Sequence, residues 1–185
     1  MTTSSPPTTA ARAKQRDTAS HAYQVIDTPL GAALVATRDI ARGERILEIA
    51  GRIQDAPTRY SIQLGHDTHI EADRALPDGE MRARHPWRFL NHACEPNAQV
   101  LGRTLVARRA IESGAQITFD YTTTEREMAE PFDCHCGSPR CIGTIRGFAH
   151  LTAEQRSERA PWLASWLSSW LASSPAPDQS NTHPR

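Results

Sequence analysis

The chain has 185 residues, with 21 Lys and Arg against 21 Asp and Glu, so its formal net charge is zero. This length suits one well-buried domain with tails and is too short for two ordinary domains. Nothing in the balanced charge suggests a footprint for nucleic acid or anionic membranes, although local patches stay open, and no apolar run reaches the length of a membrane span.

The beginning of the chain is rich in Thr, Ser, Ala and Pro and shows no apolar periodicity. Such a segment buries too little surface to offset its ordering entropy, so residues 1–21 are predicted to be a disordered tail. The same segment has no signal-peptide core, and we therefore expect a cytoplasmic location.

Short apolar and alternating runs with frequent turns predict a mainly β domain after this tail. Residues 23–26 and 34–36 predict a β-hairpin around a turn at residues 28–31. A second hairpin-like unit is expected at residues 43–51. Further strand patterns occur at residues 60–64, 69–71, 104–107 and 116–121. A polar stretch that predicts either a short helix or a loop follows at residues 125–130.

Residues 87–97 read W-R-F-L-N-H-A-C-E-P-N. The proline restricts the preceding Glu95 to an extended or turn conformation, and the composition suits neither a helix nor a strand. The stretch therefore predicts a loop that carries a site. Taken singly, such residues are more often structural, for example as a hydrogen-bonded Asn or a buried thiol.

The C-terminal part predicts helices. Residues 152–155 have the capping-box pattern of a helix start, and Pro161 suits a first helical turn. Trp and Leu then recur at a spacing of four at Trp162, Leu163, Trp166, Leu167, Trp170 and Leu171. A stripe of this kind more often packs on a core than anchors a membrane or a partner, so residues 148–172 are predicted to be a helical extension packed on the core. Residues 173–185 return to a tail composition.

Three ordered stretches give the chain a family resemblance. They are R-F-L-N-H-A-C-E-P-N at residues 88–97, Q-I-T-F-D-Y at 116–121 and C-H-C-G-S-P-R-C-I-G at 134–143. In this order they resemble the SET-domain protein lysine methyltransferases that carry a cysteine-rich post-SET segment. The resemblance implies a SET-domain fold of short β-sheets with a pseudoknot, where the first two stretches meet. It places a SET domain at residues 22–131 and a post-SET zinc segment at residues 132–147.

The resemblance also implies an activity: transfer of methyl groups from S-adenosylmethionine to the ε-amine of lysine in a protein or peptide substrate. The substrate is expected to lie extended along a strand edge. Tyr121 matches the catalytic phenol, which orients the amine and the methyl group while it stays protonated. Phe119 matches the position that controls product number, and its lack of a hydroxyl predicts more than one methyl group per lysine.

Two stretches match the family's cofactor-binding residues. The first comprises Arg88, Phe89, Asn91 and His92, although His92 taken alone would also be a general-base candidate. The second is a G-x-G motif, matched by Gly31 but with Ala33 at the second glycine. One added methyl group predicts a weakened or shifted cofactor contact rather than loss of the site. Ala93 stands where the family usually has Ser, which removes one hydroxyl but no reacting group.

The four cysteines are clustered, which favours a metal site over disulfides in a reducing compartment. Three thiolates on a short loop are one fewer than a tetrahedral zinc site needs. The resemblance assigns a structural zinc to Cys94, Cys134, Cys136 and Cys141. His135 in place of Cys94, or reduced free thiols, remain the alternatives.

A different class of function also stays open, namely a catalytically weak SET-like module that binds peptides or protein partners. Ala33 and Ala93 favour that module, whereas Asn91, His92 and Tyr121 favour the enzyme. A zinc-stapled nucleic-acid binder is disfavoured because the net charge is zero and no basic and aromatic stripe is present. Histone, ribosomal and other protein substrates are all compatible with the sequence.

Overall fold

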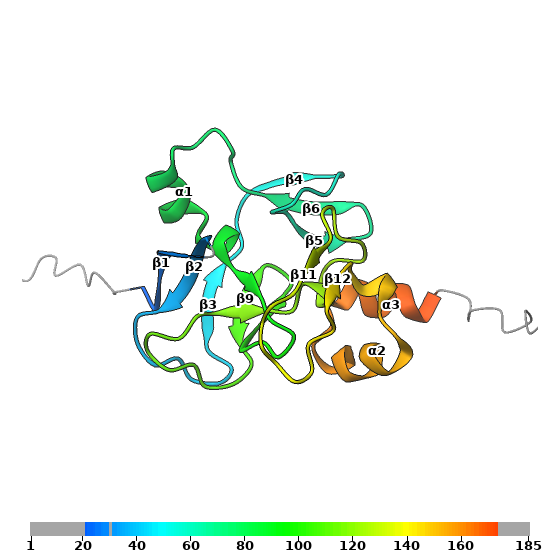
Figure 1. Cartoon of the computed structure of the whole chain (residues 1–185). Coiled ribbons are helices and arrows are strands. Elements are labelled where there is room, and N and C mark those ends of the chain that lie inside the picture. Colours follow the sequence, from blue (N-terminus) through cyan, green and yellow to red (C-terminus); the bar gives the residue numbers. More distant parts are fainter. Residues whose placement is uncertain (1–20, 30, 174–185) are drawn as a thin grey trace, which may run out of the picture.

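The structure, a computed structural model, describes residues 21–29 and 31–173. The two predicted tails therefore lie outside the described residues, apart from His21 and Ser173, and so does Leu30 in the first predicted turn. The described part contains small, mostly antiparallel sheets and a few short helices (Figure 1). This architecture confirms the prediction of a mainly β fold with a helical extension.

The first hairpin forms as predicted. Strand β1 (Tyr23–Thr28) pairs antiparallel with β2 (Gly31–Ala36), and Gly31 has a φ of +113°, a conformation that glycine adopts without strain. The hairpin lies at the opposite end of the molecule from the C-terminal helices (Figure 1).

The predicted second hairpin at residues 43–51 is wrong. Strand β3 (Arg45–Glu48) pairs with β9 (Thr104–Ala107), which in turn pairs with β8 (Ala98–Leu101). Beyond Gly51 the chain enters another sheet of order β4-β6-β5, made of β4 (Arg52–Gln54), β5 (Ile62–Gly65) and β6 (Thr68–Glu71). Gly51 lies where the chain passes from one sheet to the other. A Cβ at this position would collide with the carbonyl of Glu71, so glycine is required there. The pairing partners are distant in sequence, so the local turn pattern could not identify them.

A parallel pair of two-residue strands joins the middle of the chain. Strand β7 (Asn91–His92) pairs with β10 (Thr118–Phe119), with Asn91 opposite Thr118 and His92 opposite Phe119. The Asn-His stretch is therefore partly extended, not wholly a loop. The strand predicted at residues 116–121 is also shorter, because the chain turns into the 3-10 helix η2 (Tyr121–Thr123).

Two helices that the sequence reasoning missed lead into β7. They are α1 (Asp78–Arg84) and the 3-10 helix η1 (Pro86–Phe89). Helix α1 has acidic residues in its first turn and arginines in its last, an order that the helix dipole favours. In η1, Trp87 is buried and its indole N–H donates to the carbonyl of Ala50 at 2.9 Å. This contact fixes the approach of the chain to Asn91.

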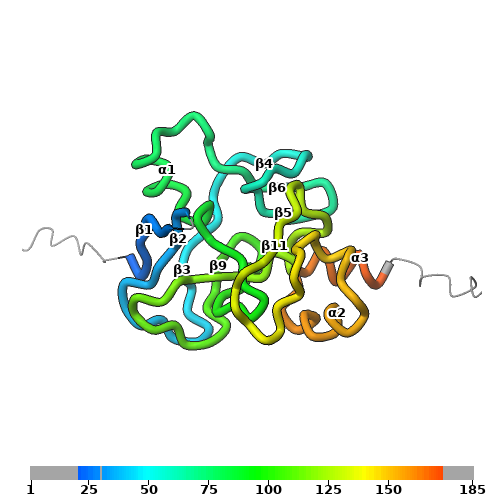
Figure 2. The backbone as a smooth tube through the Cα atoms, in the orientation of Figure 1, coloured from blue at the N-terminus to red at the C-terminus, as the bar shows by residue number. Residues whose placement is uncertain are grey.

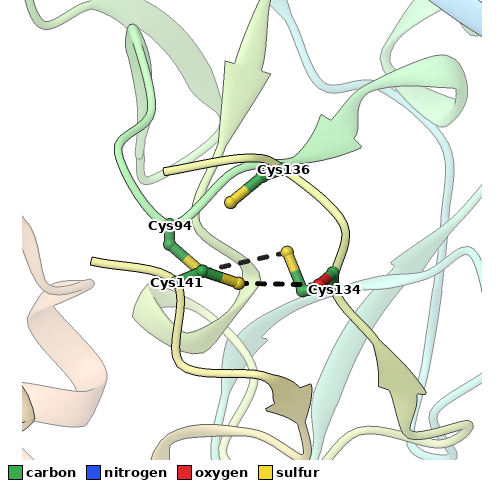
Figure 3. Close-up of side chains that lie close together, drawn as sticks. All are labelled: Cys94, Cys134, Cys136 and Cys141. Carbon is green, nitrogen blue, oxygen red and sulfur yellow. Dashed lines mark hydrogen bonds between the residues drawn. The ribbon is translucent and has the colours of Figure 1, made fainter. Parts of the chain in front are cut away.

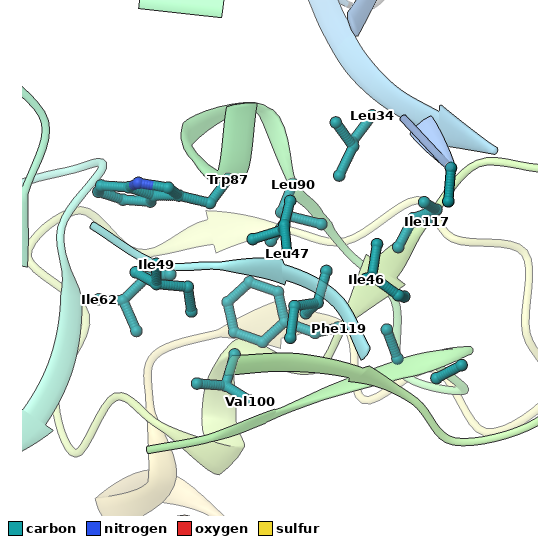
Figure 4. Close-up of a cluster of buried hydrophobic side chains, with 14 of the residues drawn as sticks. Leu34, Ile46, Leu47, Ile49, Ile62, Trp87, Leu90, Val100, Ile117 and Phe119 are labelled. Carbon is teal, nitrogen blue, oxygen red and sulfur yellow. The ribbon is translucent and has the colours of Figure 1, made fainter. Parts of the chain in front are cut away.

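The main core lies between the sheets and η1. Figure 4 shows Phe119 surrounded by aliphatic side chains from β3, β8 and neighbouring segments. Phe119 is 3% exposed and Trp87 is 1% exposed. Burial of a large apolar side chain contributes about 1.5–3 kcal/mol, so the strand before Tyr121 is held by the core itself.

The C-terminal part begins with a small hairpin of β11 (Phe132–Asp133) and β12 (Thr144–Ile145). Helices η3 (Phe148–His150), α2 (Ala153–Arg159), η4 (Ala160–Trp162) and α3 (Ser165–Ser173) follow. The path of this segment, yellow to orange, is clear in Figure 2. The predicted capping box is present: Thr152 accepts from the backbone N–H of Gln155, whose side chain accepts from the N–H of Thr152.

The Trp and Leu stripe does not form one continuous helix. The chain is extended at Leu163, so Trp162 belongs to η4 while Trp166 and Trp170 belong to α3. Four residues of the stripe pack with Phe148 and Leu151 in a second, smaller core: Leu163, Trp166, Leu167 and Trp170. Helix α3 also contacts β5 of the main domain. Within residues 21–29 and 31–173, no helix has the length and apolarity to cross a bilayer.

Candidate functional site

The site forms where β7 and β10 run side by side. Because Phe119 is paired with His92, Tyr121 emerges two residues later beside the His92 ring. The backbone N–H of Tyr121 donates to His92 Nδ1 at 3.2 Å, and the two ring centroids lie 5.3 Å apart. The structure thus brings together the two stretches that the sequence reasoning expected to meet.

The hydroxyl of Tyr121 is directed by the chain before β7. It donates a hydrogen bond of 2.6 Å to the carbonyl oxygen of Leu90. Burial raises the pKa of Tyr121, so its phenol stays protonated. Because the proton is given to Leu90, the phenol oxygen keeps its lone pairs for another group. The Phe119 ring packs on Tyr121 with 4.8 Å between centroids.

A narrow cavity of about 40 Å³ opens beside Tyr121. Its wall comprises Thr58, Arg59, Tyr60, Ser61, Ile62, Trp87, Arg88, Leu90, Phe119, Tyr121, Glu125, Met128 and Ala129. Aromatic and aliphatic side chains make up much of this wall. A slot of this size suits a slender, unbranched chain with a polar tip rather than a bulky ligand.

Glu125 is the carboxylate in that wall. Its Oε1 accepts from the backbone N–H of Gln63 at 2.8 Å and from the Thr124 hydroxyl at 3.1 Å. Burial raises the pKa of Glu125 to about 7. A carboxylate that changes charge near neutral pH inside a cavity is a candidate functional group, and the sequence reasoning did not identify it.

The hairpin β1–β2 approaches the same region from the other side. The amide of Asn91 donates from Nδ2 to the carbonyl of Ala32 at 3.3 Å, and its Oδ1 has no partner among the described residues. A Cβ placed on Gly31 would meet nothing within 4 Å, so the backbone is open there. Ala33, the residue at the second motif position, is 1% exposed and therefore buried.

Arg88 and Phe89 were also predicted to bind the cofactor, but their contacts are with residues other than Asn91. The guanidinium of Arg88 lies over the Tyr60 ring at 3.8 Å and lines the cavity. Phe89 packs against the main core, with Arg82 over its ring at 5.5 Å. Their role in cofactor binding stays a prediction.

The four cysteines converge from two separate segments (Figure 3). Cys94 follows β7, whereas Cys134, Cys136 and Cys141 lie between β11 and β12 or at their ends. Their sulfur atoms all lie within 4.8 Å of one another, and Cys94 Sγ is 3.9 Å from Cys134 Sγ. A tetrahedral zinc with bonds of about 2.3 Å places its sulfur ligands about 3.8 Å apart. The arrangement fits a four-thiolate zinc site, and His135 is not in the group.

His92 connects this cluster to Tyr121. Its Nδ1 accepts the backbone N–H of Tyr121, so the neutral ring carries its proton on Nε2. Burial lowers the pKa of His92 to about 4, which keeps the ring neutral. Nε2 lies 3.3 Å from Cys94 Sγ and donates to the sulfur. Both ring nitrogens of His92 are thus engaged within the chain.

A second buried link reaches the residue before Tyr121. Asp120 accepts from Arg159 Nε at 2.8 Å through Oδ2, and from Thr122 N and Oγ1 through Oδ1. Asp120 is the N-cap of η2, so the C-terminal helix α2 holds the turn that carries Tyr121. The Asp-Tyr pair was visible in the sequence, but nothing local marked Arg159 as its partner.

Comparison with known proteins places this geometry in a family. Residues 31–122 match the family model described as SET domain. The chain is 34% identical over 122 residues to histone-lysine N-methyltransferase ash1 of Drosophila melanogaster, covering 58% of this chain and 6% of the fly protein. It is 35% identical over 132 residues to the H3 lysine-36 specific histone-lysine N-methyltransferase of Yarrowia lipolytica, covering 63% and 17%.

Two further comparisons bear on size and fold. Methyltransferase flvH of Aspergillus flavus is 34% identical over 110 residues, covering 57% of this chain and 54% of that protein. The chain therefore spans less than a fifth of the two histone enzymes above and about half of flvH. The methyltransferase domain of human SETMAR has the same fold, with a TM-score of 0.50 and 20% identity over 68% of this chain and 58% of that chain.

Proposed function

We propose that this chain, which belongs to the SET-domain family, transfers methyl groups from S-adenosylmethionine to the ε-amine of lysine in a protein. One observation carries the proposal: the protonated phenol of Tyr121 is fixed on the Leu90 carbonyl at the wall of a narrow cavity. The proposal places the substrate lysine in this cavity, with its amine at the phenol oxygen of Tyr121.

Methyl transfer requires that the amine and the methyl group be aligned, rather than a strong acid or base. A neutral amine attacks a methyl group in line with its leaving group, and holding two reactants in this geometry can supply about 7–11 kcal/mol of the barrier. S-adenosylmethionine, when bound, supplies an electrophilic methyl group on a sulfonium. Tyr121 orients the incoming amine, while Phe119 forms the adjoining wall of the cavity.

The proposed cofactor site lies around β7 and the hairpin β1–β2. Asn91 Oδ1 is available to a ligand, and the open backbone at Gly31 lets a ligand approach closely. His92 would contribute through its backbone, because both nitrogens of its ring are already used within the chain. Arg88 and Phe89 are proposed as supporting contacts.

We assign a structural zinc to Cys94, Cys134, Cys136 and Cys141. With four protein thiolates and no open position, the ion would act as a clip and not in the reaction. It would fasten the segment between β11 and β12 to the loop after β7. Through His92, that clip also supports the backbone position of Tyr121.

The substrate class is a protein with an accessible lysine. Histone H3 is the first candidate because enzymes specific for H3 lysine-36 are among the relatives. Neither nucleic-acid nor membrane binding is part of the proposal. A cytoplasmic location is proposed from the sequence alone.

Incubation of the purified chain with methyl-labelled S-adenosylmethionine and recombinant histone H3 tests the function. Label transferred to a lysine, identified by mass spectrometry, supports it. A protein lysate provides the second substrate source when H3 is not labelled. Cofactor binding without transfer to any protein would contradict the proposed enzyme and indicate a peptide-binding module instead.

A further inference from the structure

We propose that the Glu125 carboxylate accepts the proton of the substrate ammonium group inside the cavity beside Tyr121. This inference rests on the proposed lysine methyl transfer and adds the residue that prepares the amine for attack. A lysine amine has an ordinary pKa of about 10.4, so it enters the site protonated and without a lone pair. Some group or solvent path must remove that proton before the nitrogen can react.

The position of Glu125 is fixed from several sides. Its backbone N–H donates to the Tyr121 carbonyl at 2.8 Å, and its own carbonyl accepts from Phe148 N at 2.8 Å. Its side chain is anchored through Oε1 to Gln63 N and Thr124 Oγ1. The residue is 6% exposed and forms part of the cavity wall with Tyr121.

The second carboxylate oxygen is the one available to a ligand. Among the described residues, Glu125 Oε2 has no hydrogen-bond partner, although Oε1 has two. A cavity of about 40 Å³ has room for about three waters or for the end of one unbranched chain. An ammonium group inside it therefore lies within reach of Oε2, directly or through one water.

The charges around the cavity favour the same role. The other titratable groups in its wall are Arg59, Tyr60, Arg88 and Tyr121. Arg59 forms an exposed ion pair with Glu130 at 3.2 Å, and Arg88 stacks on Tyr60. Both guanidinium groups repel any further cation that enters the cavity. Glu125 is the one carboxylate in the wall of this cavity within the described part of the chain, so it is the wall group that attracts an ammonium.

The phenol of Tyr121 does not compete for the proton at neutral pH. Burial raises the pKa of Tyr121, and its proton is engaged with Leu90. Burial also raises the pKa of Glu125 to about 7, so the carboxylate is a stronger base than an ordinary glutamate and is still largely ionised at pH 8.

The proposed step is balanced. The ammonium gives one proton to Oε2, which leaves a neutral amine and a neutral carboxylic acid. The amine lone pair then forms the new N–C bond while the C–S bond breaks and its electron pair stays on sulfur. The acid returns its proton to solvent, and the methylated ammonium must lose a proton in the same way before a second transfer.

The test is the pH dependence of kcat/KM for Glu125→Gln and wild type, on histone H3 or the lysate protein that the wild type methylates. Glutamine keeps an oxygen that accepts from Gln63 N, so the anchor of the side chain is preserved. Wild type should lose activity as the pH falls through about 7. The variant should be about 100- to 10,000-fold slower at pH 8, and the deficit should shrink toward pH 10 as lysine loses its proton unaided.

Glu127→Gln is the matched control because Glu127 lies on the same loop but is exposed and paired with His150 at 2.6 Å. Its kcat/KM should stay within about twofold of wild type. Equal pH profiles for Glu125→Gln and wild type would overturn the inference and leave the proposed function intact. A deficit that is constant across pH would also overturn it, because a structural role has no alkaline recovery. Wild type without transfer to any protein would overturn the proposed function, and this inference with it.

Discussion

Arg159 and Asp120 form a buried ion pair, with Nε 2.8 Å from Oδ2 and both side chains at most 4% exposed. The pair joins helix α2 to the turn that carries Tyr121. Arg159 Nε also donates to the Thr122 hydroxyl at 3.0 Å, so the contact holds both sides of that turn. The C-terminal extension is therefore part of the site's support and not an appendage.

Replacing Arg159 by Met should lower the free energy of unfolding by about 3–5 kcal/mol. The change keeps a long side chain but leaves Asp120 as an uncompensated buried charge. Urea denaturation measures the effect. Arg140→Met is the control: its side chain is 67% exposed and 3.9 Å from Glu95, so its loss should cost less than about 1 kcal/mol. Similar losses in the two variants would contradict the importance of the buried pair.

The cysteine cluster should contain one zinc ion per chain by elemental analysis. Structural zinc contributes an apparent 10–16 kcal/mol to its module, so a chelator should unfold the segment between β11 and β12 and abolish methyl transfer. Cys94→Ser should lower the zinc content, whereas His135→Ala should leave it unchanged. Metal-free protein that stays folded and active would end the assignment.

Tyr121→Phe should reduce kcat by about 100- to 1000-fold with little change in cofactor affinity. The change keeps the ring and removes one positioned hydroxyl, a loss comparable to an oxyanion-hole donor at about 2.7–4 kcal/mol. Tyr23→Phe on β1 provides the control and should keep normal turnover. Single-turnover kinetics with cofactor titration separate the two effects, and near-normal turnover of the Tyr121 variant would refute its catalytic role.

Phe119 should allow the enzyme to place more than one methyl group on a lysine. A methylated amine must rotate to present its lone pair again, and a wall without a hydroxyl does not hold it by a hydrogen bond. Phe119→Tyr should stop at monomethyl-lysine, as judged by mass spectrometry of the product. Monomethyl product from wild type under excess cofactor would refute the prediction, whatever the variant does.

Glu125→Gln should remove a pH-dependent part of the stability. The folded-state pKa of about 7 lies above the ordinary value of 4.5, so the folded protein binds more protons than the unfolded chain between these values. Wild type therefore loses stability as the pH rises from about 4.5 to about 7, and the loss persists above 7. The variant should gain roughly 2–4 kcal/mol relative to wild type at pH 8 compared with pH 4.5. Urea denaturation at both pH values checks this, and a pH-independent difference would contradict it.

Local patterns predicted the elements whose structure is local. The first hairpin, the strands around residues 62 and 105, and the capping box at Thr152 follow from alternation, turn residues and side-chain capping. The convergence of Cys94 with the other cysteines came from the family resemblance, and the structure places them together. The functional roles of these residues stay predictions.

Other features depend on partners that are distant in the chain. Asn91 and His92 are too short a run to show a strand pattern in the sequence. They form a strand because β10 supplies their backbone partners. The buried charge of Asp120 gives no hint that Arg159 compensates it. Glu125 begins a polar stretch that predicted a short helix or a loop, and its hydrogen bonds to Gln63 and Phe148 join it to segments distant in the chain. The spacing of the tryptophans likewise could not reveal the break at Leu163.

The link between Asp120 and Arg159 also has a consequence for biosynthesis. During translation, β7, β10 and Tyr121 are synthesised before α2, and Cys141 precedes Arg159 by 18 residues. The nascent chain must therefore carry an unpaired Asp120 until the last support is made. Support of the turn that carries Tyr121 is therefore completed late, and a chain that ended before Arg159 would contain all four cysteines but leave Asp120 without its partner.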